Sequence, residues 1–310
     1  FYRKLRKMLQ ARNVSKTYNA GKKIALQDFS IDVPTGSIYG LLGPNGAGKT
    51  SFIRIINQIT QADTGDVFIN GEKLNPNHIK DIGYMPEERG LYKNMTVGDQ
   101  LLYFGELKGM SKNHALEQAK YWFDHLEIDH WWNKKLSELS KGMAQKIQFV
   151  VTVLHQPKLL ILDEPFSGFD PVNANLVKDQ ILKLKEQGTT IILSTHRMES
   201  IEEMCDSVAL INKSKKILDG KVFEVREKFK QNLYNIVLSD VASEAFESIR
   251  NKYQFQNITD KHGLISFDLS YKEDQNLLLN DLMKAGKIRS FDEKIPSMNE
   301  VFITAVSNHN

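Results

Sequence analysis

The sequence has 310 residues, with 41 Lys plus Arg against 38 Asp plus Glu and a formal net charge of +3. Hydrophobic residues make up 41% and charged residues 25%, which excludes a disordered or low-complexity chain. The nearly balanced charge gives no reason to expect nucleic acid as the main partner. The single cysteine, Cys205, excludes an internal disulfide. No apolar run approaches the roughly 18–20 residues that span a bilayer, so we expect any membrane role to come through another chain.

The chain begins with a basic segment. Four of its first seven residues are Lys or Arg, and no apolar stretch of the kind that a signal peptide needs follows them. We therefore expect residues 1–8 to be a solvated N-terminal tail, with Met8 as the natural start.

The region after this tail predicts alternating strands and helices. Residues 37–42 form a short apolar run that ends in glycine-rich sequence, and apolar residues then recur at helical spacing. Residues 101–128 predict a helix with one apolar stripe. Residues 159–162, 190–193 and 208–211 are unbroken apolar runs, which are typical of strands covered on both faces in a parallel sheet. Strands that alternate with helices indicate an α/β core.

A second, smaller domain is expected at the carboxyl end. Residues 223–233 are highly charged and predict a helical linker. After it, the order β-α-β-β-α-β indicates a ferredoxin-like α+β unit. Its expected elements are strand 234–238, helix 241–251, strand 255–259, strand 263–269, helix 274–285 and strand 287–291. We expect residues 234–310 to form this accessory domain, which would end in a short helix at 297–306.

The most specific motif lies between the first predicted strand and the helix that follows it. Residues 43–50 match the pattern G-x-x-x-x-G-K-[ST]. Glycines let backbone N–H groups curl around phosphate oxygens, and the following helix points its positive end at the same anion. In such a loop Lys49 reaches the β- and γ-phosphates, and the Thr50 hydroxyl ligates Mg²⁺. The nucleotide-binding residues expected here are Gly43, Pro44, Asn45, Gly46, Ala47, Gly48, Lys49, Thr50 and Ser51.

Two carboxylates, Asp163 and Glu164, directly follow the apolar run at 159–162. Ligands of open α/β sheets bind at the carboxyl ends of the strands. Asp163 is therefore a candidate to hold Mg²⁺, mostly through water, and Glu164 a candidate to polarise an attacking water. The alternative is a solvated pair of charges, but the phosphate-binding motif favours the catalytic interpretation.

With these motifs, the chain resembles the ATP-binding subunits of ABC transporters over roughly residues 9–222. Residues 139–143 (LSKGM) look like the family's signature sequence, and residues 167–170 (SGFD) are similar to its D-loop. His196 matches the family's switch histidine. The motifs occur in the family's order, which makes the set more specific than any one of them. The resemblance implies a P-loop ATPase core with a helical subdomain at about 88–155.

The resemblance also implies a role for each matched residue. Lys49, Glu164 and His196 would be the catalytic residues, and Tyr18 would stack on the adenine. In this family the signature sequence contacts the nucleotide of a partner subunit, so that two subunits enclose two ATP molecules. The residues that would bind nucleotide in this way are Ser140, Gly142, Met143 and Asp170. For Tyr18 and for a single histidine at a strand end, simple packing is the alternative.

Two sites depart from the family's usual residues. The signature has Lys141 and Met143 where Gly and Gln are usual, and Lys141 would either add positive charge near the transferred phosphate or stay solvated. Glu87 stands where the family usually has its Q-loop glutamine, and we expect it either to ligate Mg²⁺ or to point to solvent. The segment PEERGLY, the LSKGM signature and the added domain are similar to the sodium- and drug-exporter branch, which pairs with ABC-2-type membrane subunits.

We therefore expect an ATPase that uses ATP and Mg²⁺ to power export through a separate integral membrane permease. ATP binding would close a homodimer, or a heterodimer of nucleotide-binding domains, and hydrolysis would reset it. The subunit would be cytoplasmic and peripheral on the inner face of the membrane, and no nucleic acid partner is expected. Two alternatives are a soluble ABC ATPase acting on ribosomes or DNA and a regulatory ABC ATPase.

Overall fold

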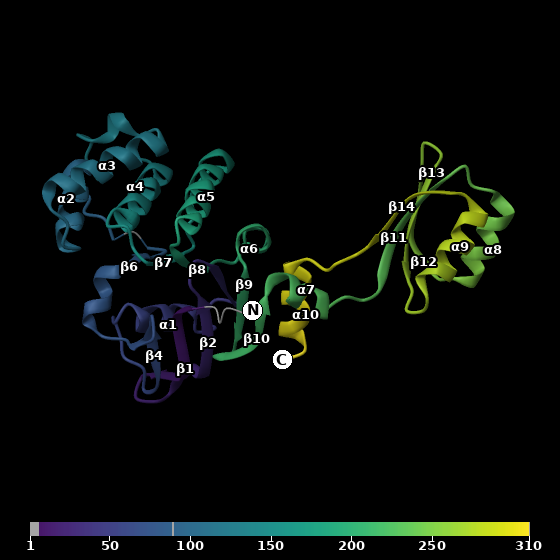
Figure 1. The fold of residues 1–310 in the computed structure, drawn as a ribbon, viewed down its shortest axis with the longest axis horizontal. Coiled ribbons are helices and arrows are strands. Elements are labelled where there is room, and N and C mark those ends of the chain that lie inside the picture. Colours follow the sequence, from purple (N-terminus) through teal and green to yellow (C-terminus); the bar gives the residue numbers. More distant parts are fainter. Residues whose placement is uncertain (1–5, 89, 310) are drawn as a thin grey trace. The chain divides into compact units, whose positions relative to one another are not determined.

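A computed structural model describes residues 6–88 and 90–309. The chain forms two compact units (Figure 1). The first runs up to Val222 and also includes the chain from Phe302 onward, and the second runs from Phe223 to Val301. We predicted that the accessory domain covers residues 234–310, up to the end of the chain. In the structure the residues from Phe302 onward belong to the first unit instead, and Ala305 among them is buried.

The first unit contains a six-stranded sheet with the order β10-β9-β3-β8-β7-β6. All neighbours pair in parallel except β10 and β9. Every residue of β3, β7 and β8 is buried, which confirms the prediction of strands covered on both faces. The strands are β3 (Ile38–Leu42), β6 (Ile82–Met85), β7 (Leu159–Asp163), β8 (Thr190–Ser194), β9 (Ser207–Asn212) and β10 (Lys215–Lys221).

A second, antiparallel sheet with the order β2-β1-β4-β5 was not predicted from the sequence. Its strands are β1 (Lys7–Tyr18), β2 (Lys23–Pro34), β4 (Thr64–Ile69) and β5 (Glu72–Lys73). The predicted solvated tail at 1–8 is wrong at its end, because β1 already begins at Lys7. Lys7 pairs with Asp32 at 2.6 Å, and Met8 is buried; residues 1–5 lie outside the described part of the chain.

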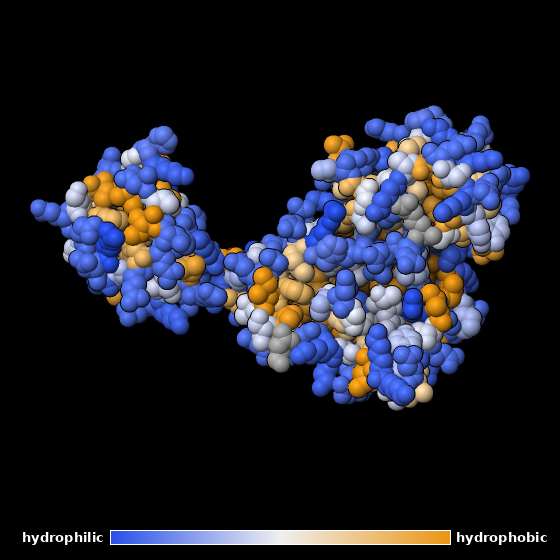
Figure 2. Space-filling view, turned by 180° about the vertical axis from the view of Figure 1, so that it is seen from behind, coloured by the Kyte–Doolittle hydropathy of each residue, from blue (hydrophilic) through white to orange (hydrophobic). Residues whose placement is uncertain are grey.

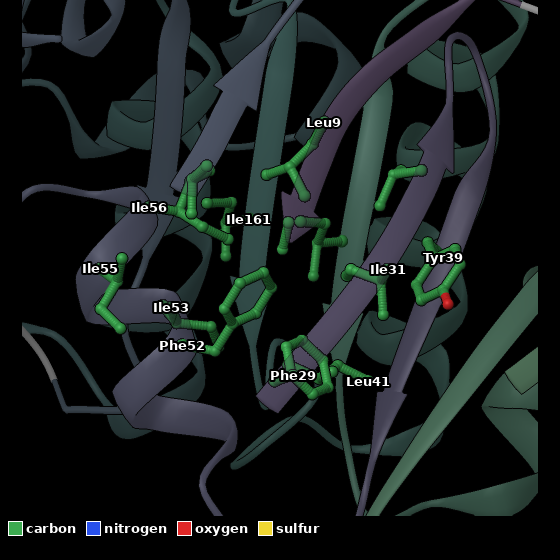
Figure 3. Close-up of a cluster of buried hydrophobic side chains, with 14 of the residues drawn as sticks. Leu9, Phe29, Ile31, Tyr39, Leu41, Phe52, Ile53, Ile55, Ile56 and Ile161 are labelled. Carbon is green, nitrogen blue, oxygen red and sulfur yellow. The ribbon is translucent and has the colours of Figure 1, made fainter. Parts of the chain in front are cut away.

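The two sheets and helix α1 (Lys49–Ile56) share one apolar core (Figure 3). Leu9 and Phe29 of the antiparallel sheet, Ile161 of β7 and Phe52 of α1 point into the same cluster. The rings of Phe29 and Phe52 meet edge to face, with centroids 4.7 Å apart. This packing fixes the helix that begins at the phosphate-binding motif against both sheets.

The predicted helix at 101–128 is in fact two helices, α2 (Val97–Leu107) and α3 (Lys112–Leu126). Gly109 between them has a φ of +84°, which ends a helix, and the Ser111 side chain accepts a hydrogen bond from the His114 N–H to start the next. α4 (Lys141–Val153) completes this helical region. Further along lie α5 (Pro171–Glu186) and α6 (Met198–Met204). Short 3₁₀ turns lie at Pro76–Asp81, Asp129–Trp131 and Leu136–Glu138.

The second unit has the predicted ferredoxin-like order of elements. Its antiparallel sheet has the order β12-β13-β11-β14, and its core includes Ile236 of β11, Phe246 of α8 and Leu282 of α9. The predicted α/β core with an α+β carboxyl-terminal unit is thus confirmed. The elements are α7 (Val222–Lys228), β11 (Leu233–Ser239), α8 (Ser243–Lys252), β12 (Phe255–Lys261), β13 (Leu264–Ser270), α9 (Gln275–Ala285), β14 (Lys287–Glu293) and α10 (Met298–Ser307), which crosses the boundary between the units.

The face shown in Figure 2 is mostly hydrophilic, with apolar residues exposed singly or in small groups on both units. Among the residues that the structure describes, the most exposed large apolar side chains are Val172 and Leu107 in the first unit and Phe223, Met283 and Leu277 in the second. Within residues 6–88 and 90–309, no helix combines the length and apolar composition needed to cross a membrane.

A partly buried histidine, His155, makes the stability of the first unit depend on pH. The Nε2 atom of His155 lies 3.2 Å from the Ile82 carbonyl oxygen, and the Lys108 ammonium donates to the same oxygen at 2.8 Å. Burial, reinforced by the Lys108 charge, lowers the pKa of His155 to about 4. The folded state therefore favours the neutral ring, which contributes its full stability above the unfolded pKa of about 6.5.

As pH falls from about 6.5 toward 4, the unfolded chain takes up a proton that the folded chain does not bind. We expect His155 alone to cost about 2 kcal/mol of unfolding free energy between pH 7.5 and pH 5. Urea unfolding of H155Q should show a pH dependence flatter than that of the wild type by this amount. The exposed His114 provides the matched control H114Q. Equal pH dependence in wild type and H155Q would contradict the prediction.

Candidate nucleotide-binding site

The loop at residues 43–50 joins β3 to α1 and requires glycine at two positions. Gly43 has a φ of +149°, and a Cβ there would lie 2.3 Å from the Ile211 carbonyl oxygen. Gly48, the N-cap of α1, has a φ of +123°, and a Cβ would lie 2.2 Å from the Ala25 carbonyl oxygen. Only glycine allows these backbone conformations and such close packing. The loop is therefore held tightly between β9 and β2.

Lys49 lies folded over this loop. Its Nζ donates to the carbonyl oxygens of Gly43 at 2.5 Å and Pro44 at 3.2 Å. Burial lowers the pKa of Lys49, and the nearby carboxylates of Asp163, Glu164 and Glu87 oppose this effect. Gly46 has open space where a Cβ would stand, so its backbone faces free volume. A cation and the start of a helix thus converge where an anion could sit.

The two carboxylates at the end of β7 have different surroundings. Asp163 is 5% exposed, and burial raises its pKa, with Glu87 and Glu164 adding to the effect. Glu164 has a φ of +51°, and its Oε1 accepts the His196 backbone N–H at 2.8 Å and lies 2.8 Å from the His196 Nδ1. Its Oε2 accepts the Thr195 hydroxyl at 3.1 Å. The backbone and side chains of Thr195 and His196 therefore orient the Glu164 carboxylate.

These groups line one pocket of about 460 Å³. Among the predicted site residues it contains Tyr18, Asn45, Gly46, Gly48, Lys49, Thr50, Ser51, Glu87, Asp163, Glu164 and His196. It also contains residues that the sequence interpretation missed: Asn19, Lys23, Ala25 and Arg54. Arg54 follows Thr50 by one helical turn, and from this spacing it could have been predicted to face the same site. Prediction of the other three would have required recognising the hairpin between β1 and β2 in the sequence.

Seven predicted nucleotide-binding residues do not line this pocket: Gly43, Pro44 and Ala47 of the phosphate loop, and Ser140, Gly142, Met143 and Asp170. Ser140 caps α4 by accepting the Met143 N–H at 3.3 Å, and Asp170 caps α5 by accepting the Asn173 N–H at 3.0 Å. A Cβ on Gly142 would lie 3.4 Å from the Gly168 carbonyl oxygen, so the signature segment and the D-loop pack together. Ser140, Gly142 and Met143 thus lie at the start of α4, and Asp170 at the start of α5, outside the pocket.

The donors in the pocket fit Mg²⁺ bound with a nucleotide triphosphate. The Thr50 hydroxyl and the carboxylates of Asp163 and Glu87 are oxygen donors in one cavity. Among the residues that the structure describes, no group of three or more His, Cys, Asp or Glu could hold a metal by itself. Mg²⁺ at phosphate sites usually takes only one or two protein carboxylates and completes its shell with phosphate oxygens and water. The glycine-lined loop supplies the matching place for the phosphates.

Known proteins resemble this chain over most of its length. The ABC transporter family model matches residues 26–167, and the model of the ATP-binding protein DrrA1-3-like, C-terminal domain matches residues 220–306. The uncharacterized ABC transporter ATP-binding protein YhaQ of Bacillus subtilis (strain 168) is 39% identical over 300 residues, which cover 96% of this chain and 98% of YhaQ.

Two further comparisons agree. The linearmycin resistance ATP-binding protein LnrL of the same organism is 27% identical over 304 residues, covering 96% of this chain and 97% of LnrL. A solved structure of an ATP-binding subunit of an ABC transporter has a TM-score of 0.67 and 28% identity, covering 72% of this chain and 93% of that one. In this chain, residues of the loop at 43–50 line one pocket together with Asp163, Glu164 and His196. The chain belongs to the ATP-binding subunits of ABC transporters.

Proposed function

We propose that this ABC transporter ATPase hydrolyses ATP·Mg²⁺ in the pocket at the phosphate loop and powers export through a separate permease. The observation that carries the proposal is the convergence of Lys49, Asp163, Glu164 and His196 in one cavity. The comparisons give no support to the alternative of an ATPase acting on ribosomes or DNA.

The proposed roles follow from the charges and contacts of the side chains. Lys49 would leave the Gly43 carbonyl to bind the β- and γ-phosphates, a stronger, charge-assisted contact. Thr50, Asp163 and Glu87 would hold Mg²⁺, which when bound neutralises charge on the phosphate oxygens. Tyr18, at the end of β1, would stack on the adenine.

Glu164 is the proposed general base. It would accept a proton from water as the water oxygen attacks the γ-phosphorus and the bond to the β–γ bridging oxygen breaks. Thr195 and His196 already donate to this carboxylate and would keep it directed at the water. Thr195 is 1% exposed, so its hydroxyl is held firmly in place.

A second subunit is needed to complete the site. The signature and D-loop residues lie outside the pocket of their own subunit, and the N-terminus of α4 that Ser140 caps is suited to bind an anion. We propose that Ser140, Gly142, Met143 and Asp170 contact the nucleotide of a partner copy in a closed ATP-bound dimer.

The similarity over 96% of the chain to a linearmycin resistance protein, and the match to the DrrA1-3-like C-terminal domain, support export as the direction of transport. We therefore place the subunit on the cytoplasmic face of the membrane, bound to its permease.

The proposal predicts that the tagged chain co-purifies in detergent with a multispanning membrane protein. The complex should contain two ATPase subunits, and the membrane protein should change the rate of ATP hydrolysis. Co-expression with an unrelated permease is the control. Recovery of the chain with ribosomes, and its absence from washed membranes, would contradict the proposal.

A further inference from the structure

The hairpin turn between β9 and β10 is built from unusual residues. Asn212 pairs with Lys215, which leaves Lys213 and Ser214 as a two-residue turn, with φ angles of 45° and 69°. Turns with two positive φ angles favour Asn-Gly, because a side chain is sterically disfavoured in this conformation. A buried serine in the position where glycine would be favoured points to an interaction that offsets the backbone strain.

Ser214 uses all three of its polar groups to join other parts of the site. Its N–H donates to the Ala47 carbonyl oxygen at 3.1 Å, and its own carbonyl oxygen accepts the Gln27 N–H at 2.8 Å. Its hydroxyl donates to the Ile24 carbonyl oxygen at 2.8 Å. Ala47 lies in the phosphate loop, whereas Ile24 and Gln27 lie in β2. One turn residue therefore connects the phosphate loop to β2.

The part of β2 that Ser214 holds forms a wall of the nucleotide pocket. Lys23 and Ala25 lie on either side of Ile24 and line the pocket. Lys23 pairs in register with Tyr18 of β1, which lines it too. We call Tyr18, Lys23 and Ala25 the β1–β2 wall. Gly48 of the phosphate loop packs so closely on the Ala25 carbonyl oxygen that a Cβ would overlap it at 2.2 Å, so the wall borders this loop directly.

We propose that Ser214 is a positioning residue whose hydroxyl fixes the β1–β2 wall relative to the phosphate loop, and so supports binding of the base and ribose of ATP. The inference rests on the proposed nucleotide site. The backbone contact of Ser214 to Ala47 does not need the hydroxyl. Loss of the hydroxyl should therefore weaken contacts along the wall and leave the phosphate contacts in place.

The test compares S214A and S214G with the wild type in the full chain. Both variants lose the bond to Ile24, and only S214G relieves the backbone strain at φ +69°. Loss of one neutral hydrogen bond predicts a Kd for ATP raised about 3- to 10-fold in both variants. The Kd for inorganic tripolyphosphate, which has no base or ribose, should change less than about twofold. The exposed neighbour Lys213 provides the matched control K213A.

Thermal unfolding separates positioning from stability. We expect S214G to have a higher Tm than S214A although both bind ATP equally weakly. If S214G regained both the Tm and the ATP affinity of the wild type, the inference would be overturned. It would also be overturned if the affinities for ATP and for tripolyphosphate fell equally. If the wild type binds ATP and S214A has the same Kd for ATP, only this inference would be overturned. A wild type that does not bind ATP would overturn the proposed site as well.

Discussion

Replacing Glu164 with Gln is expected to slow ATP hydrolysis by about 10²- to 10⁴-fold, the range typical of general acid–base catalysis. The amide keeps one oxygen that can accept the His196 N–H, and its NH₂ group can donate to the Thr195 hydroxyl oxygen where the carboxylate accepted from it. It cannot accept the proton of the attacking water. The geometry of the pocket should therefore be preserved, and the Kd for ATP should change little.

Single-turnover hydrolysis measures the chemical step, and size-exclusion chromatography in ATP and Mg²⁺ detects the closed dimer. E164Q should accumulate as an ATP-bound dimer because it cannot reset. Glu186, an exposed residue of α5, provides the matched control E186Q. Unchanged hydrolysis in E164Q would assign the base to another residue. Slow hydrolysis without an ATP-dependent dimer would contradict only the proposed sandwich.

The second large effect is expected at Lys49. The K49A variant removes the ammonium that lies folded over the phosphate loop and donates to the Gly43 carbonyl oxygen. A charge-assisted hydrogen bond contributes roughly 1.5–3 kcal/mol, so ATP affinity should fall by about 10- to 150-fold. Turnover should fall to background because the same ammonium stabilises the transferred phosphate.

Fluorescence titration with a labelled ATP analogue measures the affinity, and phosphate release measures turnover. K49R keeps the charge but not the shape of the ammonium and should restore only part of the binding. Thermal unfolding checks that both variants are folded. Near-normal ATP affinity and turnover in folded K49A would exclude this loop as the active site.

The candidate catalytic residues could be predicted because their signals are local in the sequence. The spacing of Gly43, Gly48 and Lys49 encodes one loop conformation and the start of one helix, whatever packs around them. Asp163 and Glu164 are placed by the strand that they follow. In the second unit, apolar residues recur with the period of a strand in some segments and of a helix in others. This alternation was also sufficient to predict its ferredoxin-like order of elements.

The local pattern was not sufficient where a single break decides the structure. The apolar stripe across residues 101–128 continues through Gly109, but a positive φ at this glycine ends α2, and Ser111 caps α3. Likewise β1 extends to Lys7, because Met8 is buried against distant residues that no window of the sequence contains. Secondary-structure propensity and apolar periodicity describe neighbouring residues only, so they do not include such tertiary packing.

The sequence by itself identified the candidate residues for binding phosphate, holding Mg²⁺ and activating water. Only the tertiary structure decided which of them share a pocket: it brought Thr195 to Glu164 and left Ser140 and Gly142 outside. It also joined Ser214 to Ile24, which lies 190 positions earlier in the chain. The reason is that conformational preferences act between near neighbours in the chain, whereas such contacts form only when the whole core packs.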